Sequence, residues 1–278
     1  MEVLFAEHHG FCYGVKRAIN IARNAAKNCL ETFTLGEIIH NPQMVERLKS
    51  EGIGVIHDLN EISSGTVIIR SHGVSPETYD EIKNRRLNLV DATCPHVKKA
   101  QLSAKSLVDE GYQVVIIGEK HHPEVKSIFE WANKKAIILD SEAEARSLQN
   151  FDKLGIVSQT TFSKKKFSAI VLELLEKSRD IKILRTICDA TENRQDAAVK
   201  LASKVDIMLV IGGKNSANTS RLASLCSKIV QTYHVETAAE IDPRWFSNAQ
   251  KIGITAGAST PDWVIEEAGQ KVSSYSRN

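Results

Sequence analysis

The chain has 278 residues, of which 42% are hydrophobic and 25% charged, so it is long enough to bury a sizeable core and is not of a disordered class. Its net charge of +2 is too small to indicate a nucleic-acid partner. No apolar run approaches the roughly 18 residues that cross a bilayer, and the N-terminal residues do not read as a secretory signal. We therefore expect a cytoplasmic enzyme with no membrane or nucleic-acid partner.

Short β-rich runs alternate with helical periods along the whole chain, which is typical of βαβ units with parallel sheets. Twelve runs are predicted to be strands, in chain order Val3–Ala6, Thr32–Leu35, Ile53–Ile56, Thr66–Ile69, Leu87–Val90, Gln113–Ile117, Ala136–Leu139, Leu154–Val157, Ile181–Leu184, Ile207–Ile211, Ile229–Tyr233 and Lys251–Ile254. Twelve strands divide into three sets of four. The expected fold class is α/β, with three repeated modules that each hold a four-stranded, mostly parallel sheet and flanking helices.

The five cysteines indicate how these modules repeat. An odd number of cysteines argues against a disulfide framework, and the absence of a C-x-x-C pair argues against a zinc ribbon or a thioredoxin-like motif. Cys12, Cys94 and Cys188 each lie a few residues after a predicted strand and before an amphipathic helix. Cys29 and Cys226 have no such counterparts, and we expect them to be core residues.

The spacing after these three cysteines is the same in each module. A strand-ending glycine follows each cysteine by 24 residues, at Gly36, Gly118 and Gly212. A polar residue follows four positions later, at His40, His122 and Ser216, and positions six residues past the glycine hold Pro42, Glu124 and Asn218. A second turn follows another strand in each module, at Ser71-His72-Gly73, Gln159-Thr160-Thr161 and Gly257-Ala258-Ser259. Because ligands bind at the carboxyl ends of parallel strands, the three modules are predicted to face one centre around a pseudo-threefold axis.

Three cysteines can hold a 4Fe–4S cluster while one iron has no protein ligand, and such an iron can act as a Lewis acid. Three cysteines and a histidine also suit zinc, and plain buried cysteines are common. The repeated spacing favours a ligand role over burial, but it does not separate iron from zinc.

The polar residues at the predicted strand ends are mostly hydrogen-bond donors: His40, His72, His122, Thr160, Ser216, Asn218 and Ser259. With helix N-termini they suit a phosphate or diphosphate, and the absence of a P-loop argues against a nucleoside triphosphate. Glu124 is the one acid among them. In a closed anionic site it would be driven toward its protonated form and could donate a proton, although a glutamate that stabilises a helix N-terminus is an equal alternative.

Motifs in this order, from residue 10 to about residue 261, resemble the 4-hydroxy-3-methylbut-2-enyl diphosphate reductase family of the non-mevalonate isoprenoid pathway. The matching segments are Gly10-Phe11-Cys12-Tyr13-Gly14-Val15, His40-Asn41-Pro42, Ser71-His72-Gly73-Val74, Asp91-Ala92-Thr93-Cys94-Pro95, Gly118 with His122-Pro123-Glu124, Gln159-Thr160-Thr161, Cys188-Asp189-Ala190-Thr191 through Asn193-Arg194-Gln195, Asn215-Ser216 with Asn218, and Thr255-Ala256-Gly257-Ala258-Ser259. Two positions depart from the family pattern, Gly213 and Ala217, where a serine is common.

The resemblance implies a cloverleaf of small α/β domains around a central cluster. The modules would span 14–94, 95–188 and 189–278, the last completed by an N-terminal strand within 1–13. It implies cluster ligands at Cys12, Cys94 and Cys188, diphosphate contacts at His40, His72, His122, Ser216, Asn218 and Ser259, and catalytic roles for Glu124, Thr160 and His122. Thr160 would lie near the substrate hydroxyl, and Glu124 would be the proton source.

The implied reaction is a two-electron reductive dehydration that yields isopentenyl and dimethylallyl diphosphate. It needs a redox-active 4Fe–4S cluster with three cysteine ligands and one open iron, which excludes zinc. No flavin or nicotinamide fingerprint is visible, so the electron donor is expected to be ferredoxin- or flavodoxin-like. Two alternatives stay open from sequence: a lyase-type three-cysteine cluster enzyme similar to quinolinate synthase, and a non-catalytic metal sensor, which would have no need of Glu124.

Overall fold

The computed structural model describes residues 1–29 and 31–275, and within them twelve strands form three four-stranded sheets. The strands are β1 (Glu2–Phe5), β2 (Thr32–Leu35), β3 (Ile53–Ile56), β4 (Thr66–Ile69), β5 (Asn88–Asp91), β6 (Gln113–Ile117), β7 (Ile137–Leu139), β8 (Lys153–Ser158), β9 (Asp180–Ile183), β10 (Ile207–Ile211), β11 (Gln231–Val235) and β12 (Lys251–Ala256). All twelve predicted runs form strands, and their ends differ from the predicted ends by at most two residues.

Helices connect the strands, as βαβ crossovers require. They are α1 (Tyr13–Asn28), α2 (Pro42–Ser50), α3 (Pro76–Asn84), α4 (Pro95–Asp109), α5 (Pro123–Trp131), α6 (Glu142–Ser147), α7 (Lys164–Leu174), α8 (Asp189–Ala202), α9 (Ala217–Cys226) and α10 (Asp262–Ser274). The helices α3, α4 and α5 begin with proline, whose missing N–H would have no helical partner in the first turn. None of the helices in the described ranges is long and apolar enough to cross a membrane.

The three sheets share one strand order and are parallel throughout. The orders are β3-β2-β4-β5, β7-β6-β8-β9 and β11-β10-β12-β1. In the third sheet the edge position is filled by β1, which pairs in parallel with β12 from Glu2 opposite Lys251 to Phe5 opposite Ile254. The first strand of the chain therefore completes the sheet that the last strands begin. The predicted class, α/β with four-stranded parallel sheets and flanking helices, is confirmed.

By its contacts the chain divides into two compact units. The first unit comprises residues 1–15, 39–46 and 189–278 and contains the sheet that ends in β1. The second unit comprises 16–38 and 47–188 and contains the other two sheets. The boundaries of the three predicted modules, 14–94, 95–188 and 189–278, stay a prediction, and residues 276–278 lie outside the described residues.

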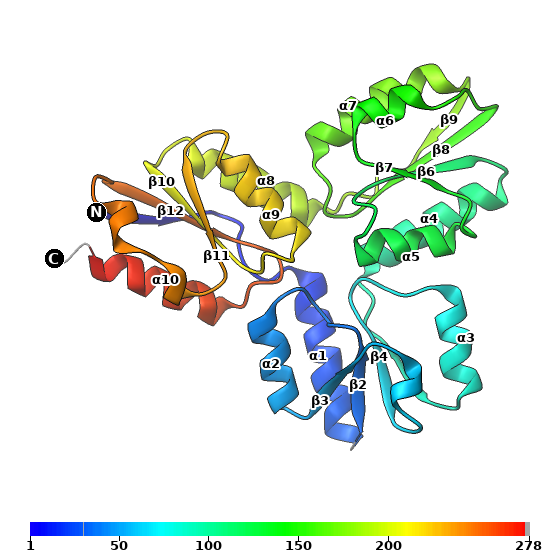
Figure 1. Cartoon of the computed structure of the whole chain (residues 1–278), viewed down its shortest axis with the longest axis horizontal. Helices are drawn as coiled ribbons and strands as arrows, with labels where there is room; N and C mark the ends of the chain where they lie inside the picture. The colour runs from blue at the N-terminus through cyan, green and yellow to red at the C-terminus, as the bar shows by residue number, and fades with distance from the viewer. Residues whose placement is uncertain (30, 276–278) are drawn as a thin grey trace. The chain divides into compact units, whose positions relative to one another are not determined.

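Both faces of the sheet in the first unit are covered. Along β10, Ile207, Leu209 and Ile211 belong to the core beneath α10, whereas Met208 and Val210 belong to the core beneath α8 and α9. Figure 1 shows the two helix layers on opposite sides of this sheet. A strand with two buried faces is apolar along its whole length, which explains why β10 reads as a continuous run and not as an alternating one.

The β6 strand in the second unit follows the same rule. Val115 and Ile117 pack toward α6 and α7, while Val114 and Ile116 pack toward α4 and α5. As a result α4 and α5 lie together on one face of the sheet, where Ala100, Ala104 and Leu107 of α4 share a core with Val125 and Ile128 of α5. This pairing decides the position of the groups at the N-termini of both helices.

Candidate active site

Each of the three cysteines that the spacing singles out stands directly before a helix. Cys12 precedes α1, Cys94 is the N-cap of α4, and Cys188 precedes α8. The repeat extends to one hydrogen bond per cysteine, because each backbone N–H donates to the carbonyl of the second polar turn. The bonds are Cys12 to Ala258 at 3.1 Å, Cys94 to Ser71 at 3.0 Å and Cys188 to Thr160 at 3.0 Å. The sequence repeat thus corresponds to a repeated cysteine environment.

The loop that carries Cys12 is held by Arg194, a buried residue of α8. Its Nε and Nη2 donate to the carbonyl of Gly10 at 3.2 and 2.8 Å. Gly10 has a φ of +69°, and a Cβ there would lie 2.9 Å from the Ile265 side chain, so only glycine fits. From the sequence, Arg194 has no predicted role beyond its place in a motif, whereas the structure shows that it holds the segment before Cys12.

The loop that carries Cys94 is fixed from both sides. Asp91 Oδ1 accepts from the Thr93 N–H at 2.9 Å, and Arg17 Nη1 donates to the Thr93 carbonyl at 3.0 Å. Arg17 belongs to α1, so this helix supports the turn directly before Cys94. Neither Arg17 nor Asp91 was predicted to be a site residue.

Within the second unit, His72 and His122 are neighbours. Their ring centroids lie 5.5 Å apart, and the rings meet edge to face. His122 is the N-cap of α5, and its Nδ1 accepts from the Glu124 N–H at 3.2 Å. A neutral imidazole that accepts at Nδ1 carries its proton at Nε2, so His122 presents a donor on its other side. Both histidines follow the carboxyl ends of strands, β4 and β6, as predicted.

Glu124 is almost fully buried, with 2% of its surface exposed, and is bonded twice to Thr160. Its Oε1 accepts from the Thr160 N–H at 2.6 Å, and its Oε2 accepts from the Thr160 hydroxyl at 3.0 Å. Burial raises the pKa of Glu124 to about 7, although the two bonds from Thr160 work in the opposite direction. Because the Thr160 carbonyl also accepts from Cys188, one residue links the acid to a cysteine.

In the first unit the predicted polar residues gather at Ser259. Its hydroxyl donates to the His40 carbonyl at 3.0 Å and lies 3.4 Å from the Ser216 hydroxyl. Ser216 is the N-cap of α9 and accepts from the Thr219 N–H. His40 does not cap α2, because Asn41 Oδ1 accepts from the Met44 N–H at 2.8 Å and takes that role.

Asn218 differs from its neighbours. Only 4% of its surface is exposed, yet neither its Oδ1 nor its Nδ2 has a hydrogen-bond partner within residues 1–29 and 31–275. A buried carboxamide without partners costs free energy unless a ligand supplies them. The predicted role of Asn218 as a ligand contact agrees with this observation.

Each unit therefore brings together its own share of the predicted residues. The second unit connects Cys94, His72, His122, Glu124, Thr160 and Cys188, and the first unit contains Cys12, His40, Ser216, Asn218 and Ser259. Cys226 is buried, and burial raises its pKa to about 12, as expected of a core thiol. Cys29, at the end of α1, is only partly buried, so the expectation of a core position was wrong for it. The α1 helix ends at the edge of its core, where a side chain stays half exposed.

The second unit also contains two buried polar residues that the sequence reading overlooked, Gln101 and Ser127. Gln101 lies on the apolar stripe of α4, between Val97 and Ala104, and is fully buried. A lone amide on an apolar stripe is the signal that could have identified it, because a buried polar group needs a partner.

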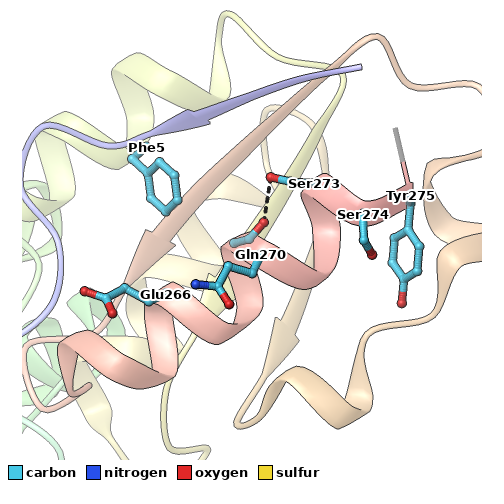
Figure 2. Close-up of a pocket in the computed structure, with 7 residues that line it drawn as sticks. Phe5, Glu266, Gln270, Ser273, Ser274 and Tyr275 are labelled. Carbon is cyan, nitrogen blue, oxygen red and sulfur yellow. Dashed lines mark hydrogen bonds between the residues drawn. The ribbon is translucent and has the colours of Figure 1, made fainter. Parts of the chain in front are cut away.

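A separate groove in the first unit has no predicted site residue. Its lining is Phe5, Glu266, Gly269, Gln270, Ser273, Ser274 and Tyr275. Figure 2 shows Phe5 of β1 across from the side chains of α10. The groove contains neither cysteine nor histidine, so it is not part of the candidate active site.

Comparisons with known proteins agree on one family. The LytB protein family model matches residues 3–273. A curated 4-hydroxy-3-methylbut-2-enyl diphosphate reductase from Geobacter sulfurreducens is 49% identical over 99% of this chain and 98% of its own length. A reductase of the same name from Syntrophotalea carbinolica is 48% identical over the full length of both chains.

Two solved structures are also similar. One, described as (E)-4-hydroxy-3-methyl-but-2-enyl diphosphate reductase, the terminal enzyme of the non-mevalonate pathway, has a TM-score of 0.73 at 42% identity, over 99% of this chain and 100% of that one. The E-1-hydroxy-2-methyl-but-2-enyl-4-diphosphate reductase from Plasmodium falciparum has a TM-score of 0.92 at 31% identity, over 96% of this chain and 86% of that one. The chain therefore belongs to the LytB family of 4-hydroxy-3-methylbut-2-enyl diphosphate reductases and is an oxidoreductase.

Proposed function

We propose that the chain reduces 4-hydroxy-3-methylbut-2-enyl diphosphate to isopentenyl diphosphate and dimethylallyl diphosphate. Two electrons and two protons enter, and the allylic hydroxyl leaves as water. The observation that carries the proposal is the link from Glu124 through Thr160 to Cys188. Thr160 is hydrogen-bonded both to a buried acid with a pKa of about 7 and to the backbone N–H of a predicted cluster ligand. A sensor module that does no chemistry has no need of such an acid.

Cys12, Cys94 and Cys188 are proposed to hold one 4Fe–4S cluster. Their environment fits an anionic sulfur ligand, because each stands at a helix N-terminus, where the helix dipole is positive. The Val15 N–H points at Cys12 Sγ at 3.4 Å, in the manner of a donor to a negative sulfur. Three thiolates leave one iron without a protein ligand, so the group supplies single electrons and a Lewis-acidic position when it is bound.

The diphosphate is proposed to bind His40, His72, His122, Ser216, Asn218 and Ser259. These residues supply imidazole, hydroxyl and carboxamide donors, and three of them, His122, Ser216 and Asn218, lie at helix N-termini, which suit an anion. The open carboxamide of Asn218 and the Nε2 donor of His122 support this assignment most directly. The proposed set contains no lysine or arginine. Such a site would recognise the diphosphate by its shape and hydrogen bonds more than by net charge.

Glu124 is proposed to be the proton source and Thr160 the residue that passes the proton or orients the hydroxyl. At neutral pH a carboxyl with a pKa of about 7 is protonated about half of the time, so it can donate and be reloaded. Thr160 bonds to both carboxylate oxygens and thereby fixes the acid in one orientation. The electrons are proposed to come from a ferredoxin- or flavodoxin-like protein.

The test is an anaerobic reconstitution followed by iron and sulfide counts, electron paramagnetic resonance and oxidation of a reduced dye by the allylic diphosphate. We expect dye oxidation that depends on substrate, and about four irons per chain. Cys188→Ser should lose iron and activity, whereas Cys29→Ala, which removes another partly buried thiol, should lose neither. Substrate-independent dye oxidation, or a protein that holds only zinc, would reject the proposal.

A further inference from the structure

The turn that follows His72 is packed between two helices of the same unit. The Val74 carbonyl, two residues past His72, accepts from Ser127 Oγ at 3.2 Å and from Trp131 Nε1 at 2.9 Å. Both donors belong to α5. Since His122 is the N-cap of α5 and Glu124 lies in its first turn, one helix both holds the His72 turn and positions His122 and the acid.

A second helix reaches the same point through Gln101 of α4. Its Nε2 donates to Ser127 Oγ at 2.5 Å, so the Ser127 hydroxyl accepts from α4 while it donates to Val74. The α4 helix begins directly after Cys94. The hydrogen bonds from Gln101 to Ser127 and from Ser127 to Val74 therefore join three segments. These are α4, which follows Cys94, α5, which carries Glu124, and the turn of His72.

Side chains crowd Gly73 at this point, although Gly73, Val74 and Ser127 also line a pocket of about 370 Å³. Gly73 has a φ of +72°, and a Cβ there would overlap Gln101 Nε2 and lie 3.1 Å from Ser127 Oγ. Gln101 is fully buried and Ser127 is 4% exposed, so loss of either side chain takes one hydrogen bond from a largely buried partner. Because Ser127 bonds to Val74 and Gln101 crowds Gly73, we expect a shift of either side chain to move the His72 turn.

We infer that Gln101 and Ser127 are positioning residues that fix His72 relative to His122. Within residues 1–29 and 31–275, neither residue has a hydrogen bond to Glu124, Thr160 or a cysteine. They act by fixing the distance and angle between the two imidazole rings, whose centroids lie 5.5 Å apart. The inference rests on the proposed role of these histidines as diphosphate contacts, so loss of the positioning should weaken diphosphate binding more than it slows the chemical step.

The experiment compares Ser127→Ala and Gln101→Met with Thr32→Val in the reconstituted enzyme. Thr32 is a matched control, because it is also buried in this unit and its hydroxyl donates to a backbone carbonyl, that of Cys29, at the start of β2. For each protein we would measure KM and kcat with the allylic diphosphate, the Kd of inorganic diphosphate by calorimetry, the iron content and the midpoint of thermal unfolding.

Ser127→Ala and Gln101→Met should each raise KM and the Kd of inorganic diphosphate about tenfold, the effect of roughly one lost hydrogen bond, with kcat changed much less. The double variant should be no worse than the worse single variant, because both act on one contact. Ser127→Thr, which keeps the hydroxyl, should restore the wild-type Kd. Thr32→Val should lower the unfolding midpoint without a change in Kd.

Unchanged Kd and KM in both variants, or the same rise in Thr32→Val, would overturn the inference. If Ser127→Ala does not fold, Gln101→Met decides, since methionine keeps the volume of the buried side chain. If the wild-type protein neither binds inorganic diphosphate nor oxidises the dye, the proposed function is wrong. If the wild-type protein turns over normally and the variants are unaffected, only the positioning role is wrong.

Discussion

The N-termini of α5 and α9 occupy the same place in their sheets and hold different chemistry. Glu124 and Asn218 each lie six residues past a strand-ending glycine, Gly118 or Gly212, and each is almost fully buried. Glu124 is bonded twice to Thr160 within its own unit, whereas neither polar atom of Asn218 has a partner in the part of the chain that the structure describes. One backbone position therefore serves an internal acid in one unit and an open amide in the other.

This difference matches the two roles that we propose: Glu124 holds a proton, and Asn218 binds the ligand. A carboxyl that Thr160 satisfies needs no ligand and can keep its orientation through a catalytic cycle. An unsatisfied carboxamide gains its missing hydrogen bonds only when a ligand arrives, so it adds to affinity. The repeat puts the two side chains at equivalent positions, and the type of residue at each position sets the role that we propose for it.

Among the substitutions that test this comparison, Glu124→Gln should lower activity the most. The amide keeps the shape of the side chain but cannot donate a proton to the leaving hydroxyl, so kcat should fall by about 10²- to 10³-fold while KM changes little. Steady-state kinetics with the reconstituted protein measure both. Glu119→Gln, which removes a nearby acid, is the control and should keep kcat near the wild-type value. Intact turnover in Glu124→Gln would remove the acid from the mechanism.

The pH dependence of kcat gives the next effect. Burial raises the pKa of Glu124 to about 7, and the proton donor is the protonated form, so activity should be highest below this pH and fall as the pH rises through it. The decline should approach tenfold per pH unit well above pH 7. Glu124→Gln should lose this alkaline limb in its remaining activity. If the limb persists there, it belongs to another group.

Spacing alone indicates the three cysteines and the strand-end turns, because βαβ repeats put equivalent residues at equivalent sheet edges. It does not indicate the bond between Glu124 and Thr160, which joins side chains 36 residues apart and depends on their rotamers. The cap of α2 shows the same limit: the spacing equates His40 with His122 and Ser216, but Asn41 caps the helix. Gln101 and Ser127 escaped notice because they lie outside the repeated positions, on helix faces where the sequence predicts only packing.

Asn218→Asp tests the open amide and should have a smaller effect on the reaction than loss of the acid. The substitution puts a carboxylate at the position that is equivalent to Glu124 in the repeat. Its negative charge should repel the diphosphate and raise KM by about tenfold or more. The kcat at saturation should change little, because this position supplies no proton. Asn218→Ala, which removes the amide without adding charge, should raise KM less. A fall in kcat with an unchanged KM would mean that the two helix N-termini do not divide the work between them.

Ser259→Ala should give the smallest effect. The Ser259 hydroxyl already donates to the His40 carbonyl and lies 3.4 Å from the Ser216 hydroxyl, so it holds its neighbours in addition to the ligand contact that we propose for it. Because the helix cap of Ser216 stays in place without it, we expect KM to rise only about two- to fivefold, less than one full hydrogen bond. Ser203→Ala, which removes a hydroxyl from the exposed turn directly after α8, should leave KM unchanged. If Ser259→Ala raised KM as much as Asn218→Asp, a bonded hydroxyl would matter as much as an unbonded amide. The contrast between satisfied and open groups would then fail as a guide to which residues bind the diphosphate.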